Sequence, residues 1–168
     1  ERLNDLWIGT FHSLFSRLLR FDIEKYNDPE GLKWTRQFSI YDETDSQTLV
    51  KEIITQDMSL DPKRFDPKKI KRAISNAKNQ CFTSNDLEEK ADNHFDKIIA
   101  DAYKRYRVSL SKNNALDFDD LLLLPVFLLR QNDLVRDYWH KRFQHILVDE
   151  YQDTNRTQYE LIKLITAG

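Results

Sequence analysis

Two adjacent carboxylates, Asp149 and Glu150, directly follow the apolar run Ile146-Leu147-Val148. The run is typical of a buried strand because it is short, β-branched and flanked by turn-prone residues. Ligands of open α/β sheets bind where strands end, and neighbouring side chains on a strand point to different sides. One carboxylate could therefore hold Mg²⁺ in a nucleotide hydrolase while the other orients and deprotonates the attacking water. The alternative is an acidic strand-to-loop turn with solvated side chains.

A second candidate site lies at the start of the helix predicted after Gly9. Thr10 is a candidate N-cap, and a helix N-terminus offers N–H groups and a positive dipole end to a phosphate. The ring of Phe11 and the imidazole of His12 could meet the sugars or bases of single-stranded DNA. The alternative is that Phe11 belongs to the core, with the apolar residues that follow it at helical spacing, and that Thr10 is only a cap.

A basic cluster lies between residues 61 and 80, where seven basic residues stand against two acidic ones. The local charge of +5 contrasts with a net charge of −2 for the whole chain. The candidates for contact with DNA phosphates are Lys68, Lys69, Lys71 and Arg72. Such contacts would weaken as salt rises. The alternative is that the cluster is simply the solvated face of a helix.

The composition excludes several other classes of site. With three glycines in 168 residues, neither the G-x-G-x-x-G nor the G-x-x-x-x-G-K-S/T phosphate loop can be written. A single cysteine, Cys81, rules out an internal disulfide and a multi-cysteine zinc site, and it fits a reducing cytoplasm. The longest apolar run, residues 121–129, is far shorter than the roughly 20 residues of a membrane-spanning helix. We expect Cys81 and three histidines without metal-ligand spacing to be structural: His94, His140 and His145.

The elements that must position these groups are mostly helices, as the low glycine content favours. Short strands are predicted near the two ends, at 6–8 and 143–148. Helices are predicted to begin at Thr10 and at Asp66-Pro67, and to span about 42–58, 84–91, 93–110, 117–130, 134–140 and 156–165. In the leucine-rich helix 117–130, Asp117 is the expected N-cap, with Asp119 and Asp120 as first-turn acids.

The predicted fold class is mainly α, with a helical domain inserted into a mostly absent α/β domain. Glu1 is not a methionine, and no leader pattern follows it. We therefore expect the chain to be a piece of a longer protein.

Three segments resemble the superfamily 1 helicases of the UvrD/PcrA/Rep family. Residues 149–155, D-E-Y-Q-D-T-N, match that family's Walker B motif, which reads D-E-F/Y-Q-D-T-N. Residues 9–13, G-T-F-H-S, match an earlier motif, and residues 115–122, A-L-D-F-D-D-L-L, look like the D-F-D-D-L-L segment that precedes Walker B. The order and approximate spacing agree with the family, whereas the likeness in the middle of the chain is weak.

The resemblance implies a division of the chain into three segments. Residues 1–9 and 144–168 would be edges of the first RecA-like motor domain, a P-loop-type α/β domain. Residues 10–143 would be the helical accessory domain inserted into it.

The resemblance also implies roles for single residues. Asp149 would be the Mg²⁺ ligand, Glu150 the catalytic base and Gln152 a residue lining the nucleotide site. The residues that correspond to the motif touching single-stranded DNA are Thr10, Phe11 and His12.

For the parent protein, the resemblance implies hydrolysis of ATP with Mg²⁺, movement 3′ to 5′ along single-stranded DNA, and separation of duplex DNA in repair or replication. The expected setting is the cytoplasm, at the nucleoid, with repair or replication proteins as further partners and no membrane. Because the phosphate loop is missing, we expect the fragment alone to be inactive and to hold no nucleotide. The alternative is a non-catalytic helical module that binds DNA or another protein.

Overall fold

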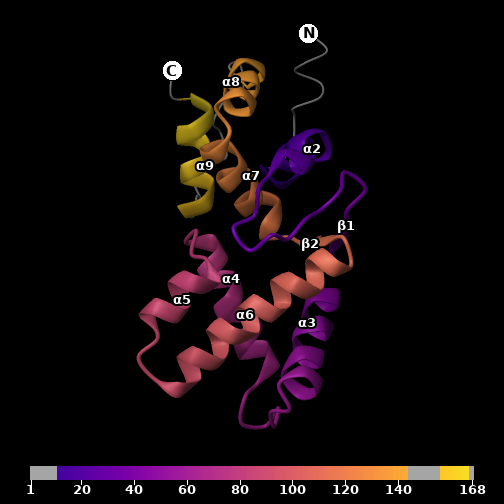
Figure 1. The fold of residues 1–168 in the computed structure, drawn as a ribbon, viewed down its shortest axis with the longest axis vertical. Helices are drawn as coiled ribbons and strands as arrows, with labels where there is room; N and C mark the ends of the chain where they lie inside the picture. Colours follow the sequence, from indigo (N-terminus) through magenta and orange to yellow (C-terminus); the bar gives the residue numbers. More distant parts are fainter. Residues whose placement is uncertain (1–10, 144–155, 167–168) are drawn as a thin grey trace. The chain divides into compact units, whose positions relative to one another are not determined.

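The computed structural model describes residues 11–143 and 156–166. Apart from two three-residue strands, all the elements in these ranges are helical (Figure 1). In chain order they are α2 (Phe11–Asp22), the 3-10 helix η1 (Ile23–Lys25), β1 (Ser39–Tyr41), α3 (Glu43–Glu52), the π-helix η2 (Ile53–Asp57), α4 (Pro67–Asn79), α5 (Ser84–Lys90), α6 (His94–Lys112), β2 (Ala115–Asp117), α7 (Asp120–Gln131), α8 (Asp133–Arg142) and α9 (Arg156–Thr166). The prediction of a mainly α fold is confirmed.

The chain divides into two compact units. Unit 1 comprises residues 1–38 and 120–168, and unit 2 comprises residues 39–119. The predicted boundaries at 9/10 and 143/144 separate an inserted helical domain from the edges of a motor domain. They are not the boundaries of these two units, and they stay a prediction.

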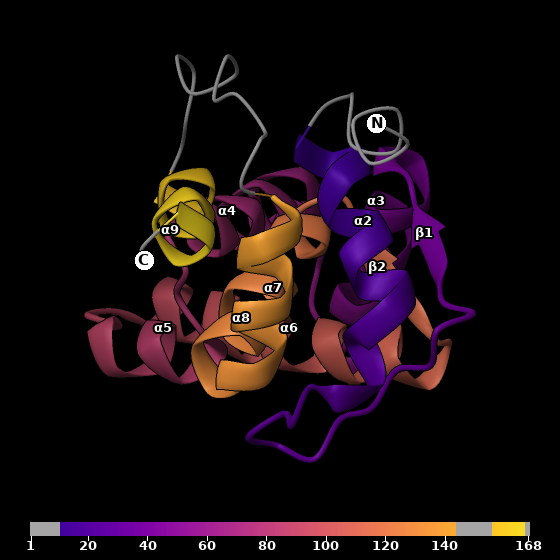
Figure 2. The same cartoon turned by 90° about the horizontal axis from the view of Figure 1, so that it is seen from above.

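The centre of unit 1 is α7, whose sequence DLLLLPVFLLRQ is apolar on nearly every side. A helix of this kind must be covered all round, and α2, α8 and α9 pack against it (Figures 1 and 2). Its four consecutive leucines, Leu121 to Leu124, are each 2% exposed. Pro125 lies inside α7 without splitting the helix.

A buried polar contact links α2 to α8 within unit 1. The indole Nε1 of Trp139 donates a hydrogen bond to Asp22 at 2.6 Å, and Lys25 forms an ion pair with the same carboxylate at 3.0 Å. Trp139 is 1% exposed. Its N–H therefore has the partner that a buried indole needs.

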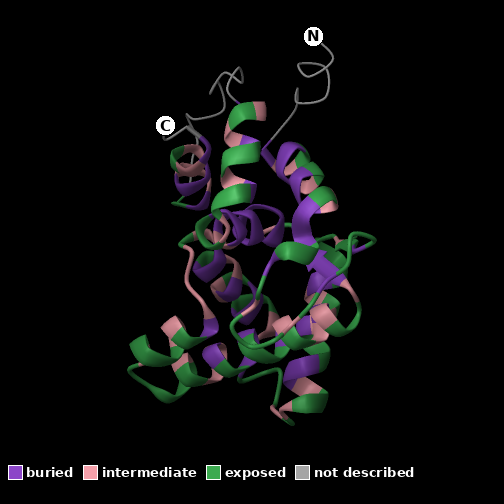
Figure 3. Ribbon diagram, turned by 45° about the horizontal axis from the view of Figure 1, so that its top comes forward, coloured by how far each residue is buried: buried purple, intermediate pink, exposed green. Residues whose placement is uncertain are grey.

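In unit 2, α4 and α6 pack against each other and against α3, and α5 packs along α6. The helices of this unit alternate between buried and exposed residues in Figure 3, as amphipathic helices do. The side chains at the centre of its core include Ile54, Ile70, Ile74, Tyr103 and Tyr106. The strands β1 and β2 form a parallel pair in which Ser39 lies opposite Ala115 and Tyr41 opposite Asp117.

Most predicted helices are confirmed within a few residues. The predicted helix 42–58 is α3 followed by the π-helix η2, and 93–110 is α6. Asp66 caps α4 with Pro67 as its first residue, as predicted. The predictions for 84–91, 134–140 and 156–165 correspond to α5, α8 and α9.

The expected start of the leucine-rich helix is wrong. Asp117 is not an N-cap but the last residue of β2, and α7 begins three residues later at Asp120. The strands β1 and β2 were also not predicted. The physical reason is that the partners of Asp117 are distant in sequence: its backbone lies opposite Tyr41 in the β1–β2 pair, and its side chain binds Lys78, 39 residues away.

The predicted strand 6–8 and most of 143–148 lie outside the described residues. Phe143 is described, and it is the buried C-cap of α8. None of the described helices combines the length and apolarity needed to cross a membrane.

Candidate functional site

The basic cluster predicted from the sequence lies on α4, whose start is fixed by its cap. The carboxylate of Asp66 accepts a hydrogen bond from the backbone N–H of Lys68 at 3.1 Å, and Pro67 supplies a preset backbone angle at the first position. Three of the four predicted contact residues are exposed: Lys68, Lys69 and Arg72. We call these three side chains the basic face of α4.

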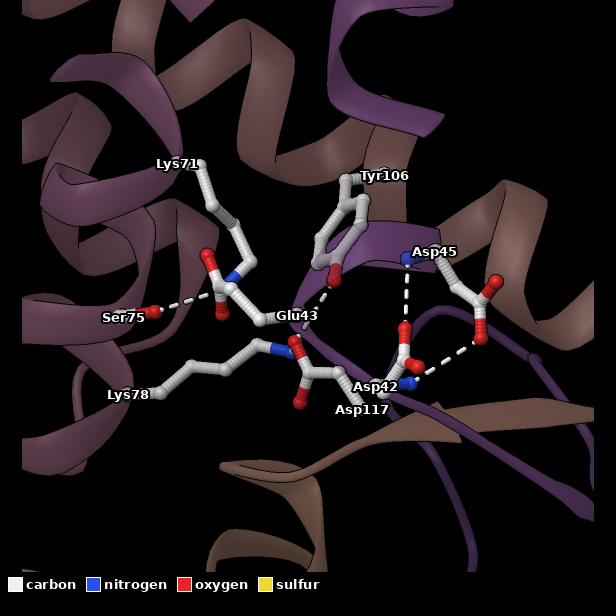
Figure 4. Close-up of polar contacts among 8 residues, drawn as sticks. All are labelled: Asp42, Glu43, Asp45, Lys71, Ser75, Lys78, Tyr106 and Asp117. Atoms are coloured by element: carbon white, nitrogen blue, oxygen red, sulfur yellow. Dashed lines mark hydrogen bonds and ion pairs between the residues drawn. The ribbon is translucent and has the colours of Figure 1, made fainter. Parts of the chain in front are cut away.

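Lys71 does not belong to this face, which corrects its prediction as a surface contact. It is 4% exposed, and its Nζ donates to Ser75 Oγ at 2.9 Å and to Glu43 Oε1 at 3.4 Å (Figure 4). Lys71 follows Lys69 by two residues and so lies about 200° further round the helix. Its ammonium group is therefore committed to an intramolecular ion pair with α3.

Lys78, another member of the predicted cluster, is also buried, at 1% exposure. Its Nζ lies 3.0 Å from Asp117 Oδ2, and Tyr106 donates its hydroxyl to the same oxygen at 2.8 Å (Figure 4). The ammonium group also lies 4.9 Å from the centre of the Tyr106 ring, within range of a cation–π contact. A buried charge is tolerated only when it is paired and hydrogen-bonded, and this cluster meets both conditions.

Burial and neighbouring charges shift two carboxyls of this segment in opposite directions. Burial raises the pKa of Asp117, but the Lys78 and Lys71 charges and the hydrogen bonds from Lys78 and Tyr106 outweigh it, so its pKa lies below 3.8. Burial also raises the pKa of Asp119, and the negative charge of Asp117 raises it further, above 3.8. The nearby lysines pull against this rise without offsetting it. The pKa of Asp117 is therefore lowered and that of Asp119 is raised, although the two carboxyls are only two residues apart.

The N-terminus of α3, which supplies Glu43, is held by a reciprocal capping box. Asp42 accepts from the N–H of Asp45 at 2.8 Å, and Asp45 accepts from the N–H of Asp42 at 3.2 Å (Figure 4). This arrangement satisfies donors that a helix start leaves without helical partners. The capping box also fixes the backbone at Glu43, the first residue of α3, whose side chain pairs with Lys71.

Of the residues predicted at the start of the first helix, Phe11 and His12 are described, both on α2 of unit 1. Phe11 is 9% exposed and stacks on Phe15 with ring centres 6.1 Å apart. Phe15 in turn contacts Phe143 at 5.5 Å. This geometry favours the alternative in which Phe11 belongs to the core. His12 is half-buried.

A second charge cluster surrounds Glu160 on α9, the helix that begins directly after the D-E-Y-Q-D-T-N segment. Glu160 is 6% exposed, and Arg130 of α7 and Arg156 lie 3.1 and 2.8 Å from its two oxygens. Lys163 lies 3.9 Å away. Although burial raises the pKa of Glu160, the hydrogen bond from Arg130 and the charges of all three cations lower it below 4.5. The cluster ties α9 to α7.

The remaining predicted site residues, Thr10, Asp149, Glu150 and Gln152, lie outside the described residues. Across the part of the chain that is described, no group of three or more metal-binding side chains comes together. The structure thus brings together the basic face of α4 and the buried cluster beneath it. It does not test the acidic pair.

The buried cluster was missed in the sequence, although a signal for it exists. On α4, Lys71 and Lys78 are seven residues apart and share one side of the helix, next to the apolar positions Ile70 and Ile74. A lysine that borders an apolar stripe either extends along it to solvent or is buried, and a buried ammonium group needs a paired carboxylate. The partner Asp117 could not be identified, because its position in space depends on the pairing of β2 with β1.

Comparison with known proteins assigns the class of this chain. The family model of the UvrD/REP helicase N-terminal domain matches residues 1–168. The chain therefore belongs to the UvrD/REP helicase N-terminal domain family, as the resemblance of its motifs predicted.

Among its curated relatives are proteins named ATP-dependent DNA helicase PcrA. The relative from Bacillus subtilis is 41% identical over 160 residues, which cover 95% of this chain and 21% of the relative. A relative from Staphylococcus epidermidis is 39% identical over 165 residues, covering 98% of this chain and 22% of the relative. One from Staphylococcus aureus is 38% identical over 162 residues. The chain spans about a fifth of the length of these relatives.

Proposed function

We propose that this chain is part of an ATP-dependent DNA helicase that uses Mg²⁺ and ATP to move 3′ to 5′ along single-stranded DNA and to separate duplex DNA. The observation that carries the proposal is the segment D-E-Y-Q-D-T-N at residues 149–155, in a chain whose whole length matches the helicase family. The relatives named as ATP-dependent DNA helicases support it.

The acidic pair supplies the chemistry in this proposal. Carboxylate oxygens suit Mg²⁺, which prefers hard oxygen ligands, and Asp149 would hold it. Bound Mg²⁺ would neutralise charge on the phosphates of ATP. Glu150 would orient the attacking water and accept its proton. Gln152 would line the nucleotide site.

The test is ATP turnover by the helicase that carries this chain, measured with single-stranded DNA present. Replacing a catalytic general base costs about 10²- to 10⁴-fold in rate, so we expect a loss of that order for Glu150→Gln and a comparable loss for Asp149→Asn. Asp101→Asn is the matched control, because it removes an exposed carboxylate on α6. Normal turnover in both test variants would contradict the proposal.

The isolated 168 residues provide a second arm of this test. They contain no G-x-x-x-x-G-K-S/T segment, and we expect no ATP turnover from them alone. Turnover that Asp149→Ala abolishes would contradict this expectation.

The basic face of α4 supports a DNA-contacting role for the helical part of the chain. Lys68, Lys69 and Arg72 project from one exposed side of a helix whose opposite side is buried. Exposed cations grouped in this way would contact DNA phosphates without reading sequence. Through this contact, the helical part of the chain would help the helicase to hold duplex or forked DNA.

Exchange of the three basic-face residues for glutamine tests this contact in the intact helicase. Duplex affinity should fall, and the slope of log affinity against log salt should become shallower by up to about 0.9 for each lost phosphate contact. The matched control removes the same charge from three separated exposed positions, Lys51, Lys90 and Lys97. An equal loss in test and control variants would assign the effect to net charge instead of to α4.

A further inference from the structure

The helix α4 presents three different faces. Its basic face is exposed, and its apolar face, with Ile70, Ile74 and Ala77, lies in the core of unit 2. Between them runs a polar side formed by Lys71, Ser75 and Lys78. Spacings of four and three residues align these three positions on one side of the helix. The two lysines of that side are buried, and each is paired with a carboxylate.

The two ion pairs anchor α4 to two different elements of unit 2. Lys78 binds Asp117 at the end of β2, and the hydroxyl of Tyr106 from α6 shares the same carboxylate oxygen. Lys71 reaches Glu43 at the start of α3. These contacts are directional, whereas packing of Ile70 and Ile74 is not. Rotation of α4 about its axis would break both pairs and would also move Ile70 and Ile74 out of the core, so the pairs add a directional restraint to that of the apolar face.

Stability alone does not account for a buried pair of this kind. Replacing a buried ion pair with apolar residues of similar volume is often neutral or stabilising, because two charges no longer lose their hydration. What a directional pair can add is selection of one orientation of the helix, a role that buried polar groups have in some proteins. On α4, orientation decides which lysines reach solvent, because Lys69 and Lys71 lie about 200° apart around the axis.

We propose that the cluster of Lys78, Tyr106 and Asp117 is a positioning device that fixes the rotation of α4 and so aims its basic face at DNA. Asp117 and Lys78 are positioning residues, since they act through α4 and do not touch DNA themselves. The inference rests on the proposed DNA contact of the basic face. It assigns a purpose to the first aspartate of the D-F-D-D-L-L segment.

The test is a neutral variant of the intact helicase, Lys78→Met with Tyr106→Phe and Asp117→Leu, which removes all members of the cluster together. We expect its thermal unfolding midpoint to be no lower than that of the unchanged protein. Duplex affinity at low salt should nevertheless fall by about tenfold, as when a few phosphate contacts are lost. Tyr103→Phe is the matched control, because it removes another buried hydroxyl of α6, bonded to the carbonyl of Phe82, and leaves the cluster intact, so it should keep the affinity.

Acylation of lysine amines, read by mass spectrometry, reports the orientation of α4 directly. In the unchanged protein Lys68 and Lys69 should react rapidly while Lys71 is protected. In the neutral variant Lys71 should gain reactivity. Rapid labelling of Lys71 in the unchanged protein would overturn the proposal.

The remaining outcomes separate this inference from the proposed DNA contact. If the neutral variant folds and binds DNA normally while glutamine at the basic face abolishes binding, the contact stands and the positioning role fails. If glutamine at the basic face has no effect, the contact itself fails, and the positioning role fails with it. A neutral variant that does not fold would also overturn the positioning role, because it would show the pair to be a requirement for stability.

Discussion

Asp117 and Asp119 are two residues apart, yet their environments shift the pKa of the two carboxyls in opposite directions. Asp117 faces Lys78 and the Tyr106 hydroxyl, and these partners outweigh the cost of burial. Asp119 loses hydration and also meets the charge of Asp117. The acidity of a carboxyl is therefore decided by its partners in space more than by its position in an acidic run.

Substitution of Asp119 tests the sign of this effect on stability. Because folding raises its pKa, the contribution of Asp119 to stability is fully present below the unfolded pKa and is lost as pH rises through the folded pKa. Asp119→Asn should therefore increase the free energy of unfolding at about neutral pH, and the gain should disappear at about pH 3. Urea unfolding at the two pH values measures both effects.

Two comparisons check that result. Asp101→Asn, an exposed partner of Arg105, should change stability by no more than about 0.5 kcal/mol at either pH. Asp117 should show the opposite dependence, since its lowered pKa contributes stability above the unfolded pKa that is lost as pH falls through the folded value. A loss of stability in Asp119→Asn at neutral pH would show that its charged form is favoured in the fold.

At the scale of elements, helix starts were predictable where the capping residue and its helix are neighbours in sequence. Asp66 before Pro67 is such a case, and the hydrogen bond to the N–H of Lys68 forms as the spacing predicts. Asn93 and Asn132 cap α6 and α8 in the same way. Each of these bonds closes within a few residues, so local sequence contains both partners.

Removal of the α4 cap should have a limited effect of known size. Asp66→Ala should lower the free energy of unfolding by about 1 kcal/mol, because a backbone N–H at the helix start loses its acceptor. Asp66→Asn retains an acceptor and should cost less than about 0.5 kcal/mol. Equal stability of the alanine variant and the unchanged protein in urea unfolding would show that water replaces the cap without cost.

The strands β1 and β2 show where element prediction fails. Each has three residues, and Ser39 finds its partner Ala115 at the other end of unit 2. Three residues are too few for the alternation of apolar and polar side chains that indicates a strand. For the same reason the local pattern predicts a helix cap at Asp117, because the apolar helix pattern lies next to it while Lys78 is 39 residues away.

At the scale of the molecule, the sequence allowed the helical class to be predicted, since three glycines leave few cheap positions with positive φ. With so few glycines, other residues take the positive φ values that turns require. Among the described residues, Ser59, Cys81 and Asn114 take positive φ without being glycine, alongside Gly31. The division into units could not be predicted, because α2 and α7 pack together although all the residues of unit 2 lie between them in the sequence.

The candidate site was predictable in part for a similar reason. The charge count between residues 61 and 80 identified the helix that bears the basic face. It could not distinguish Lys68 from Lys71, because exposure depends on which side of α4 meets α3. The acidic motif was identified by its residue types alone, so its chemistry is tested by the turnover of the variants at Asp149 and Glu150.

The parallel pairing of β1 with β2 also has a genetic consequence. Ser39 opens unit 2 and Asp117 stands near its close, and both belong to one short sheet. A stretch whose two ends are neighbours can be spliced into a host chain with little loss of loop entropy. Residues 39–119 thus form a segment that could be inserted into another protein. Its sequence could also change in evolution without altering the topology of the rest of the chain.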